Sequence, residues 1–424
     1  MTTFLPWAFL FCVMNSGQAE EVSLLEFRNV SQKQQTPTKS FWDIGRSLED
    51  SGIEIELGIT GIYQQNVHGG ISTHRRVGIN AGSYDLDLSA DLEKLLGIEN
   101  AHLFVHTKGF WSKSAGVDGP SVGSFFGVNG DAFPRDPAVI TELWYEQFMS
   151  EETFLFMMGN IDLTGGFERS DYPIAFDSSA FANDETSQFL NSALVNNPTI
   201  PFPVYALGVA GYYNPDDWWY ISAAFVDAQN DLRETGFQTT FHGEDYFFYI
   251  LETGVTPQLD SLNGSLWGSY RIGFWNDPRP KAHSDAAKTY RDDIGFYLAF
   301  DQMLAKENPE FGDSQGLGAF ARYGYADDRK NDMTGFWSFG FQYQGLIDGR
   351  DYDVLGAGFA QGFFSDRASG TYTDDYESAL ELYYNAHFTP WLNIGPSIQY
   401  ITNPGGSGTV SDAVVLGVRA QMSF

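Results

Sequence analysis

The chain ends in AVVLGVRAQMSF, residues Ala413–Phe424, and this stretch decides the fold. From Val414 onward every second position carries an apolar side chain, while the positions between carry Arg419, Gln421 and mostly small residues. A period of two is that of a β-strand, whose successive side chains point to opposite faces. The stretch therefore predicts a strand with one apolar face that ends on an aromatic residue.

Fifteen further segments upstream show the same alternation. Most have about ten residues, the length that a tilted strand needs to cross a bilayer. An even number of such segments is typical of outer-membrane β-barrels. The sixteen predicted strands cover residues 53–64, 77–88, 101–113, 139–149, 153–162, 204–214, 218–227, 246–257, 264–275, 293–302, 316–325, 335–344, 353–363, 377–389, 391–401 and 413–424.

The connections between these segments differ in length, as in a barrel with short turns at one rim and long loops at the other. A loop as long as 163–203 inside a compact fold is usually functional or disordered, so we expect it to fold inward and narrow the pore. The short predicted turns are Glu151–Glu152, Asn214–Asp217 and Thr389–Pro390, and the long loops are 114–137, 163–203, 228–243 and 276–292.

The composition excludes several classes of protein. The chain has 424 residues, with 24 Lys and Arg against 55 Asp and Glu, so its formal net charge is −31. That charge argues against nucleic-acid binding, which needs a basic face for the phosphates. Aromatic residues make up 16% of the chain, which argues against disorder. The sequence has no run of 18 apolar residues, so it predicts no membrane helix.

Alternation alone fits a soluble β-sandwich as well as a barrel, and three features favour the membrane. Phe424 ends the last strand, aromatic residues gather at strand ends as in Trp218–Tyr220, and sixteen strands that close on themselves need no partner sheet. The predicted fold is all-β: a closed antiparallel transmembrane β-barrel of about 16 strands, with long extracellular loops and an inward-folded constriction loop.

The N-terminus resembles an export signal. Phe4–Met14 form an apolar core, and Gly17 and Ala19 place small residues before a cleavage site, although no basic residue precedes the core. We therefore expect a signal peptide over 1–19, a flexible segment over 20–45 and the barrel domain over 46–424. Cys12 is the one cysteine, so the mature chain would contain no disulfide.

Four blocks, in order along the chain, resemble the carbohydrate-selective porin (OprB-type) family. They are Asp87–Gly97, Glu142–Gln147, Phe181–Asn191 and Trp391–Gly406, the last followed by the terminal strand. The resemblance extends over nearly all of 45–424. It implies a sixteen-stranded outer-membrane barrel that passes monosaccharides by diffusion. It also implies cationic groups in the constriction and a preference for anions. The net charge of −31 argues against an anion preference in this chain.

If the apolar faces meet lipid, the opposite faces line the pore. Charged and amide groups there can bind sugar hydroxyls, and flat aromatic rings can pack on the C–H face of a sugar. Arg271 with Trp267 is the strongest predicted pair. The alternative is a generic wet lumen in which Arg–Glu pairs serve stability. The predicted pore-lining, substrate-binding residues are Trp267, Arg271, Trp275, Glu142, Trp144, Glu146, Arg322, Gln342, Glu381, Gln399 and Arg419.

For the other polar residues, the sequence predicts structural roles rather than metal binding or catalysis. His102 and His106 share a strand face, which predicts lumen-lining residues rather than a metal site, since a third ligand is missing. The carboxylate pairs Asp85 with Asp87 and Glu54 with Glu56 predict solvated charges rather than glycosidase chemistry. Calcium at the loop pairs Asp327–Asp328 and Asp374–Asp375 stays open. We expect no metal, no cofactor and no enzymatic activity.

The leading hypothesis is an outer-membrane porin that lets monosaccharides and similar small solutes diffuse passively through a polar and aromatic-lined pore. The alternatives are a general or ion-permeable porin without sugar selectivity, a plugged structural or adhesive barrel, and a secreted glycan-processing β-protein, because architecture alone does not determine function. The expected partners are small solutes and outer-membrane lipid in the bacterial outer membrane, and a homotrimer and a monomer both remain open.

Overall fold

The computed structural model describes residues 48–74, 78–112, 116–149, 153–164, 175–183, 189–216, 218–229, 240–241, 243–282, 288–308, 315–368 and 372–424. The predicted signal peptide and flexible segment, over 1–19 and 20–45, lie outside the described residues. Among the described residues, none of the helices has the length and apolar character needed to cross a bilayer.

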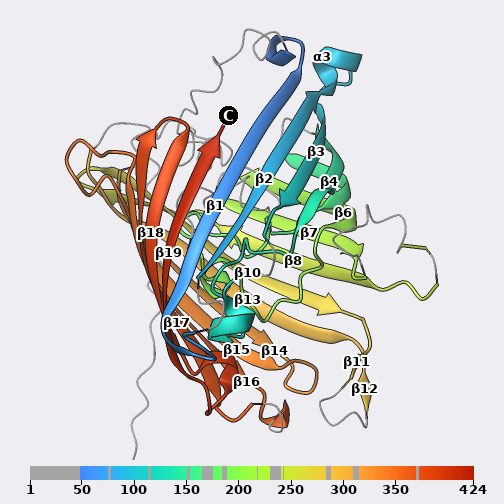
Figure 1. Cartoon of the computed structure of the whole chain (residues 1–424). Coiled ribbons are helices and arrows are strands. Elements are labelled where there is room, and N and C mark those ends of the chain that lie inside the picture. The colour runs from blue at the N-terminus through green and yellow to red at the C-terminus, as the bar shows by residue number, and fades with distance from the viewer. Residues whose placement is uncertain are drawn as a thin grey trace, which may run out of the picture.

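Long antiparallel strands make up most of the described chain (Figure 1). They are β1 Ile53–Gly70, β2 Gly78–Asp91, β3 Ala101–Phe110, β4 Asp136–Met149, β5 Phe154–Ile161, β6 Ala206–Asp216, β7 Trp219–Asp227, β8 Phe247–Val255, β9 Gln258–Ser261, β10 Gly264–Asp277, β13 Asp293–Lys306, β14 Gly316–Ala326, β15 Met333–Gln344, β16 Val354–Phe364, β17 Tyr376–Thr389, β18 Leu392–Thr402 and β19 Ser411–Ser423. The short elements are α3 Leu92–Leu96, η2 Asp118–Val122, α4 Ser192–Val195, β11 Lys281–Ala282, β12 Thr289–Tyr290, η3 Asp366–Ala368 and η4 Pro404–Gly406.

The strands close into a barrel. β8 and β9 pair with successive parts of β10 and form one strand that is interrupted at Pro257, which has no N–H to donate to the ladder. β1 pairs with β2 on one side and with β19 on the other, so that Ile59 lies opposite both Tyr84 and Met422. With β8 and β9 taken together, the described residues form a closed barrel of sixteen strands. All sixteen predicted strands are therefore confirmed.

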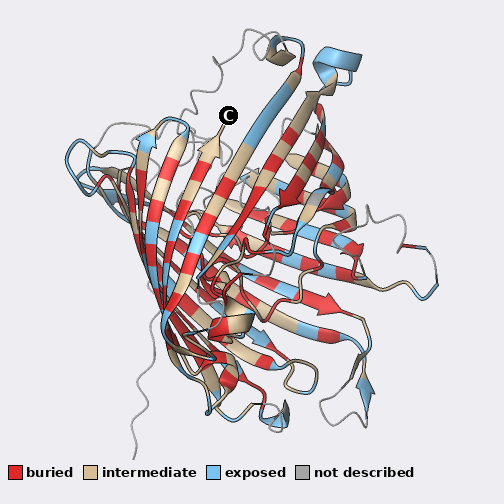
Figure 2. Cartoon of the chain, in the orientation of Figure 1, coloured by how far each residue is buried: buried red, intermediate tan, exposed pale blue. Residues whose placement is uncertain are grey.

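Burial alternates along the strands as predicted (Figure 2). On β19, Leu416 is 44% exposed on the outer face, whereas Arg419 is 5% exposed on the inner face. The aromatic row of β15 points outward, with Phe339 41% exposed. The prediction that the apolar faces point outward is thus confirmed for these strands, and the polar faces point into the lumen.

The two rims differ. One carries α3 and the C-terminus, and we call it the short-turn rim; the opposite end carries the β11–β12 hairpin, and we call it the long-loop rim (Figure 1). Connections of two residues, such as that between β17 and β18, lie at the short-turn rim. The turn predicted over Asn214–Asp217 is shorter in the structure because β6 continues through Asp216. The predicted turn Glu151–Glu152 lies outside the described residues.

Two stretches of the long connections run inside the barrel: residues 116–132, the first inner segment, and residues 175–183 with 189–204, the second inner segment (Figure 1). The second inner segment is mostly buried, and about half of the first inner segment is buried. Phe189 and Leu194 pack in one hydrophobic cluster with wall residues of β14 to β17. Phe176 and Ile200 pack in a second cluster with wall residues of β4 to β13.

Glycines on the inner face make room for these segments. A Cβ on Gly318 would stand 1.9 Å from the ring of Phe181, and one on Gly324 would stand 2.2 Å from the hydroxyl of Thr199. Such distances are far below van der Waals contact, so only glycine lets the segment approach the wall this closely. The second inner segment therefore lies against β14 because these wall positions have no side chain, as well as through its hydrogen bonds.

Candidate permeation pathway

Arg322 on β14 joins the wall to the second inner segment. Its Nε donates to the carbonyl oxygen of Asp177 at 3.1 Å, and its Nη1 donates to the carbonyl oxygen of Leu194 at 2.7 Å. Its Nη2 donates to Oδ1 of Asn183. The Asp177 carboxylate lies 3.5 Å from Nε; burial raises the pKa of this carboxyl to about 6, and Arg322 opposes the rise. One guanidinium thus holds two distant parts of the segment.

Arg271 on β10 makes a second junction. It donates to the carbonyl oxygen of Ser178 and forms an ion pair with Asp301 on the neighbouring strand β13. Both side chains of the pair are almost fully buried. A buried ion pair needs additional hydrogen bonds to offset its desolvation, and here the carbonyl of the inner segment supplies one. Arg271 therefore binds protein groups, Ser178 and Asp301, in this structure.

Side chains of the wall strands β17, β18 and β1 bind backbone groups of both inner segments. Glu381 accepts hydrogen bonds from the N–H groups of Leu190 at 3.0 Å and Asn191 at 2.8 Å. Gln399 and Gln64 each donate to the carbonyl oxygen of Val128 at 2.8 Å. These contacts fix the two inner segments to β17, β18 and β1.

Glu377, four residues before Glu381 on the same face of β17, holds the first inner segment. It accepts hydrogen bonds from the Ser124 hydroxyl at 2.5 Å and from the N–H groups of Phe125 at 2.7 Å and Phe126 at 3.1 Å. Charge-assisted bonds of this kind are about twice as strong as neutral ones. β17 therefore carries two carboxylates that anchor two different parts of the inner structure.

The wall formed by β2, β3 and β4 carries charged side chains of both signs. His106 Nε2 lies 3.4 Å from Oδ1 of Asp85, and its Nδ1 lies 3.5 Å from Oε1 of Glu142. Lys108 Nζ lies 3.2 Å from Oδ1 of Asp85 and 3.3 Å from Oδ1 of Asp131 in the first inner segment. Both His106 and Lys108 face the lumen, as predicted, and belong to one network of ion pairs.

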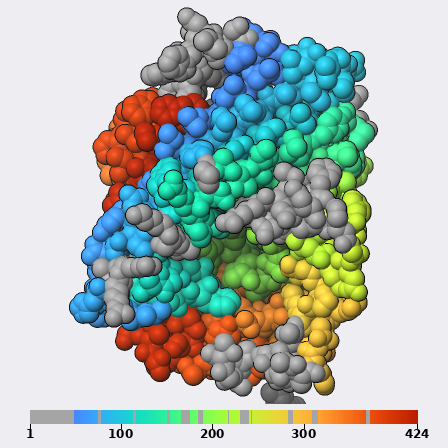
Figure 3. All heavy atoms as spheres, turned by 45° about the vertical axis from the view of Figure 1, so that its right-hand side comes forward, coloured from blue at the N-terminus to red at the C-terminus, as the bar shows by residue number. Residues whose placement is uncertain are grey.

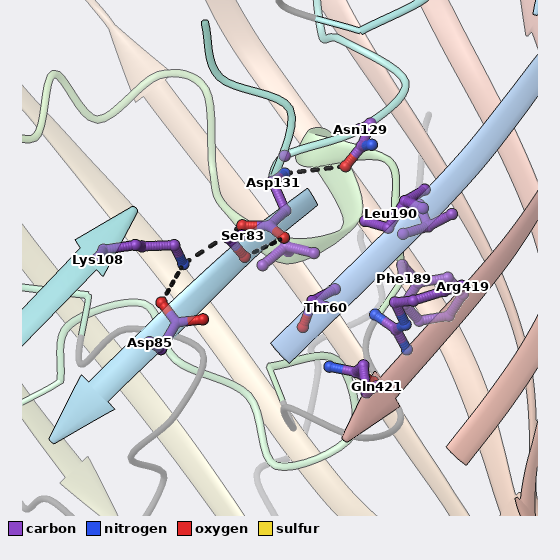
Figure 4. Close-up of a pocket in the computed structure, with 13 residues that line it drawn as sticks. Thr60, Ser83, Asp85, Lys108, Asn129, Asp131, Phe189, Leu190, Arg419 and Gln421 are labelled. Atoms are coloured by element: carbon purple, nitrogen blue, oxygen red, sulfur yellow. Dashed lines mark hydrogen bonds and ion pairs between the residues drawn. The ribbon is translucent and has the colours of Figure 1, made fainter. Parts of the chain in front are cut away.

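A polar cavity of about 20 Å³ lies between this wall and the inner segments. Figure 4 shows Asp85, Lys108 and Asp131 at one side of it and Arg419 and Gln421 of β19 at the other. The cavity has room for about one water molecule. At this cavity, charged side chains of the wall border a space between the wall and the inner segments.

The molecular surface is hollowed at the level of the second inner segment (Figure 3). The hollow lies between the blue-green chain of β3, β4 and the first inner segment on one side and the yellow strands near residue 300 on the other. Green atoms, the colour of residues near 200, form its floor. The second inner segment therefore lies across the inside of the barrel.

The three predicted tryptophans face inward but pack on protein. Trp267 stacks on Phe181 with ring centroids 5.0 Å apart. Trp275 is 2% exposed and lies over Gly295, where a Cβ would stand 2.2 Å from its ring. Trp144 is buried in the second hydrophobic cluster and donates from Nε1 to Glu142 at 3.0 Å. In this structure the rings support the wall and the inner segment.

All eleven predicted residues lie on the inner face, but the structure does not bring them to a single point. Arg271, Arg322, Glu381 and Gln399 bind the inner segments. Arg419 lines the cavity. Glu146 lies on β4 with its Oε1 3.2 Å from Nδ1 of His102, and Gln342 is buried on β15. That these side chains contact solute stays a prediction.

Sequence reasoning missed several residues with a clear structural role. Asp177, Asn183 and Asp131 lie in loops, where alternation provides no signal. Glu252 on β8 accepts hydrogen bonds from the hydroxyls of Tyr220 and Tyr297, each at 2.7 Å. Its inward position was readable from the alternation of its strand, whereas its partners were not.

The described residues contain no group of three or more His, Cys, Asp or Glu side chains placed to hold a metal ion. At the loop pair considered for calcium, Asp327 is engaged by Arg329 through bonds of 2.9 and 2.6 Å, and Lys330 lies 3.5 Å away. These cations hold the Asp327 pKa below its usual range. The Asp327 carboxylate is thus already compensated by protein.

A polar, obstructed lumen inside a sixteen-stranded barrel is the architecture of a porin. The family described as "Carbohydrate-selective porin, OprB family" matches residues 75–424. The chain belongs to this family. Its membership makes it an outer-membrane porin of the sugar-selective OprB type, a channel rather than an enzyme.

Relatives and solved structures agree with the OprB assignment. Porin B of Pseudomonas aeruginosa is 25% identical and covers 89% of this chain and 88% of its own. The putative porin QuiX of Acinetobacter baylyi is 22% identical and covers 89% of this chain and 91% of its own. The high-pH structure of Pseudomonas putida OprB has a TM-score of 0.73 at 20% identity, over 90% of this chain and 96% of that chain, and supports the barrel fold.

Proposed function

We propose that monosaccharides and similar small solutes diffuse passively between the inner segments and the wall formed by β1 to β4 and β19. The observation that carries this route is the polar cavity between Lys108 and Arg419. Cationic donors and carboxylate acceptors suit sugar hydroxyls, and weak contacts at several points let a solute enter and still leave. A monosaccharide is larger than this cavity, so its passage there requires side chains or inner segments to shift.

The predicted residues then act in two ways. Those that face free space or the ion-pair network contact the solute directly. Those that bind or support the inner segments position them and thereby set the width of the passage. We assign direct contact to Glu142, Glu146 and Arg419, and positioning to Trp144, Trp267, Arg271, Trp275, Arg322, Glu381 and Gln399. Gln342, which is buried on β15, is assigned neither role.

The test is osmotic swelling of liposomes that contain the detergent-extracted protein. Glucose, a disaccharide and a neutral amino acid close to glucose in size are compared. Faster swelling in glucose than in the amino acid, reduced by Arg419→Gln but not by the exposed control Arg329→Gln, supports direct contact. Rates graded by size alone favour a general porin, and the absence of swelling favours a plugged barrel.

Two features outside the pathway complete the proposal. Residues 1–19 act as a signal peptide, so N-terminal sequencing of protein from the outer membrane is expected to start at Glu20. The outward apolar faces contact lipid, and the barrel has no catalytic activity. The mass of the protein in detergent distinguishes the monomer from the homotrimer.

A further inference from the structure

The outer face of the wall is recessed across β5 to β8, β10, β13 and β14, where a groove of about 920 Å³ lies. We call it the outer groove. Strand pairing places Phe156, Gly211, Ala223 and Leu251 side by side on β5 to β8. A glycine and an alanine thus stand between two large apolar side chains, and the recess follows from their small size. Small-ligand sites have volumes of about 300–1,000 Å³, so the outer groove is large enough to be one.

The outer groove is lined mostly by apolar and aromatic side chains, and none of the described residues that line it is charged. Phe225 and Phe274, which border it, are exposed. The chain is an outer-membrane porin, so the bilayer surrounds this face of the barrel. Unbranched acyl chains are the hydrocarbon that this environment supplies, and they fit a recess between rings. The occupant that this lining favours is therefore a lipid acyl chain.

Asn276 is polar, unlike most of the lining, and provides a second, independent observation. It lies between the inward-facing Trp275 and Asp277 on β10, so its side chain points outward, into the outer groove. The residue is only 8% exposed, and its Oδ1 accepts no hydrogen bond from any described residue. Leaving a buried amide oxygen unpaired costs free energy, above all in a bilayer, where no water replaces the partner. A hydrogen-bond donor on the occupant of the groove would remove that cost.

Asn276 also lies at the level where a lipid carries such a donor. It is the second-last residue of β10, and the β11–β12 hairpin of the long-loop rim follows it (Figure 1). Lipid head groups lie at the level of the rims, whereas acyl chains lie along the wall between them. The cross-strand neighbours of Asn276, Tyr249 and Ile294, are exposed, so their side chains can turn and give a ligand access to Oδ1. We propose that the outer groove binds one acyl chain of an outer-membrane lipid, whose hydroxyl or amide N–H near the head group donates a hydrogen bond to Asn276.

Two esters that differ by one hydroxyl test this site: methyl 3-hydroxytetradecanoate, which can donate to Asn276, and methyl tetradecanoate, which cannot. Each ester is titrated into the protein in detergent micelles, and native mass spectrometry counts the ester molecules retained per chain. We expect one hydroxy ester per chain, bound about fivefold more tightly than the plain ester, which is the effect of one hydrogen bond. In Asn276→Leu, which keeps the size of the side chain, both esters are expected to bind equally.

Filling the outer groove gives a second variant. Ala223→Trp is expected to abolish retention of both esters, whereas the control Ala357→Trp, at an outward alanine of β16 that does not line the groove, is expected to bind them as the parent protein does. The lipid site is overturned if the parent protein retains no ester or binds both equally, or if Asn276→Leu or Ala223→Trp binds them as the parent does. A dimer or trimer mass that Ala223→Trp converts to a monomer assigns the groove to a second copy of the chain instead. The lipid site does not depend on the route of sugars, so glucose uptake tests the proposed function separately.

Discussion

Nη1 of Arg322, in the middle of β14, donates a hydrogen bond of 2.7 Å to the carbonyl oxygen of Leu194 in the short helix α4. This bond ties the wall to a segment that crosses the lumen. The side chain of Arg322 is fully buried, and its other nitrogens bond to Asp177 and Asn183. Arg322 therefore holds the second inner segment at three points, beside the contacts that Arg271 and Glu381 make with it.

Arg322→Ala is expected to release this segment. Removing one partner of a buried ion pair costs about 3–5 kcal/mol, because the remaining charge stays buried without compensation. We expect a lower unfolding midpoint in detergent and faster liposome swelling in a disaccharide relative to glucose. The control Arg329→Ala removes a half-exposed ion pair with Asp327 and is expected to leave the unfolding midpoint close to that of the parent protein, because exposed ion pairs contribute little to stability. Equal effects of the two variants would contradict a positioning role.

Glu381 offers a graded test of the same idea. Its two carboxylate oxygens accept separate N–H groups, of Leu190 and Asn191, so Glu381→Gln keeps one acceptor and Glu381→Ala keeps none. An unsatisfied buried group costs about 1–3 kcal/mol. We expect the loss of stability and the gain in disaccharide permeability to increase from Gln to Ala. Glu307→Gln, an exposed substitution near the short-turn rim, serves as the control.

A substitution at Gly318 tests how closely the second inner segment packs against β14. A Cβ at this position would overlap the ring of Phe181, so Gly318→Val is expected to displace the ring and with it the stacked Trp267. Overpacking of this kind typically costs about 1–3 kcal/mol. Tryptophan fluorescence and thermal unfolding measure the change. Gly61→Ala, where no atom lies within 4 Å of the added Cβ, is expected to behave like the parent protein.

Asp118, in the first inner segment, predicts a dependence of stability on pH. Burial raises the pKa of its carboxyl to about 7, against a hydrogen bond from the N–H of Ser124 that lowers it, and the nearby Glu377 raises it further. The unfolded chain loses this proton near pH 4, so the contribution of the group to stability is present below pH 4 and is lost as the pH rises to 7. At about 1.4 kcal/mol per pH unit, the loss is at most about 4 kcal/mol.

The matching variant is Asp118→Asn, whose side chain is neutral at every pH. We expect the variant and the parent protein to unfold at similar temperatures at pH 4, and the variant to be the more stable of the two at pH 8. Thermal unfolding in detergent at both pH values measures this. A constant difference between the two proteins would show that the ionisation of Asp118 is not linked to folding.

Leu416 tests the lipid face. It lies near the middle of β19 and points outward, so Leu416→Arg is expected to cost about 2–4 kcal/mol, the cost of a cation near the bilayer midplane. Leu416→Phe keeps the position apolar and is expected to change stability by less than about 1 kcal/mol. Folding into vesicles, followed in urea, compares the variants. A similar cost for both would place this face away from lipid.

Much of the barrel was predictable from alternation. The positions of all sixteen strands and the inward direction of Arg271 and Arg419 follow from a period of two, because the pleat of a strand determines the face of each side chain locally. The partners of these side chains were not predictable. Arg271 was expected to face solute, and it binds Ser178 and Asp301. Nothing in a single strand indicates which loop reaches it.

The amino-acid sequence by itself determined the strands, their faces and hence the barrel, since hydrophobic periodicity is local and each face must match lipid or lumen. Only the tertiary structure decided what fills the lumen. The bond between Arg322 and Asp177 joins residues 145 positions apart, and the bond between Gln399 and Val128 joins residues 271 positions apart. Such contacts exist only after the barrel closes and brings wall and inner segments together, so no local pattern encodes them.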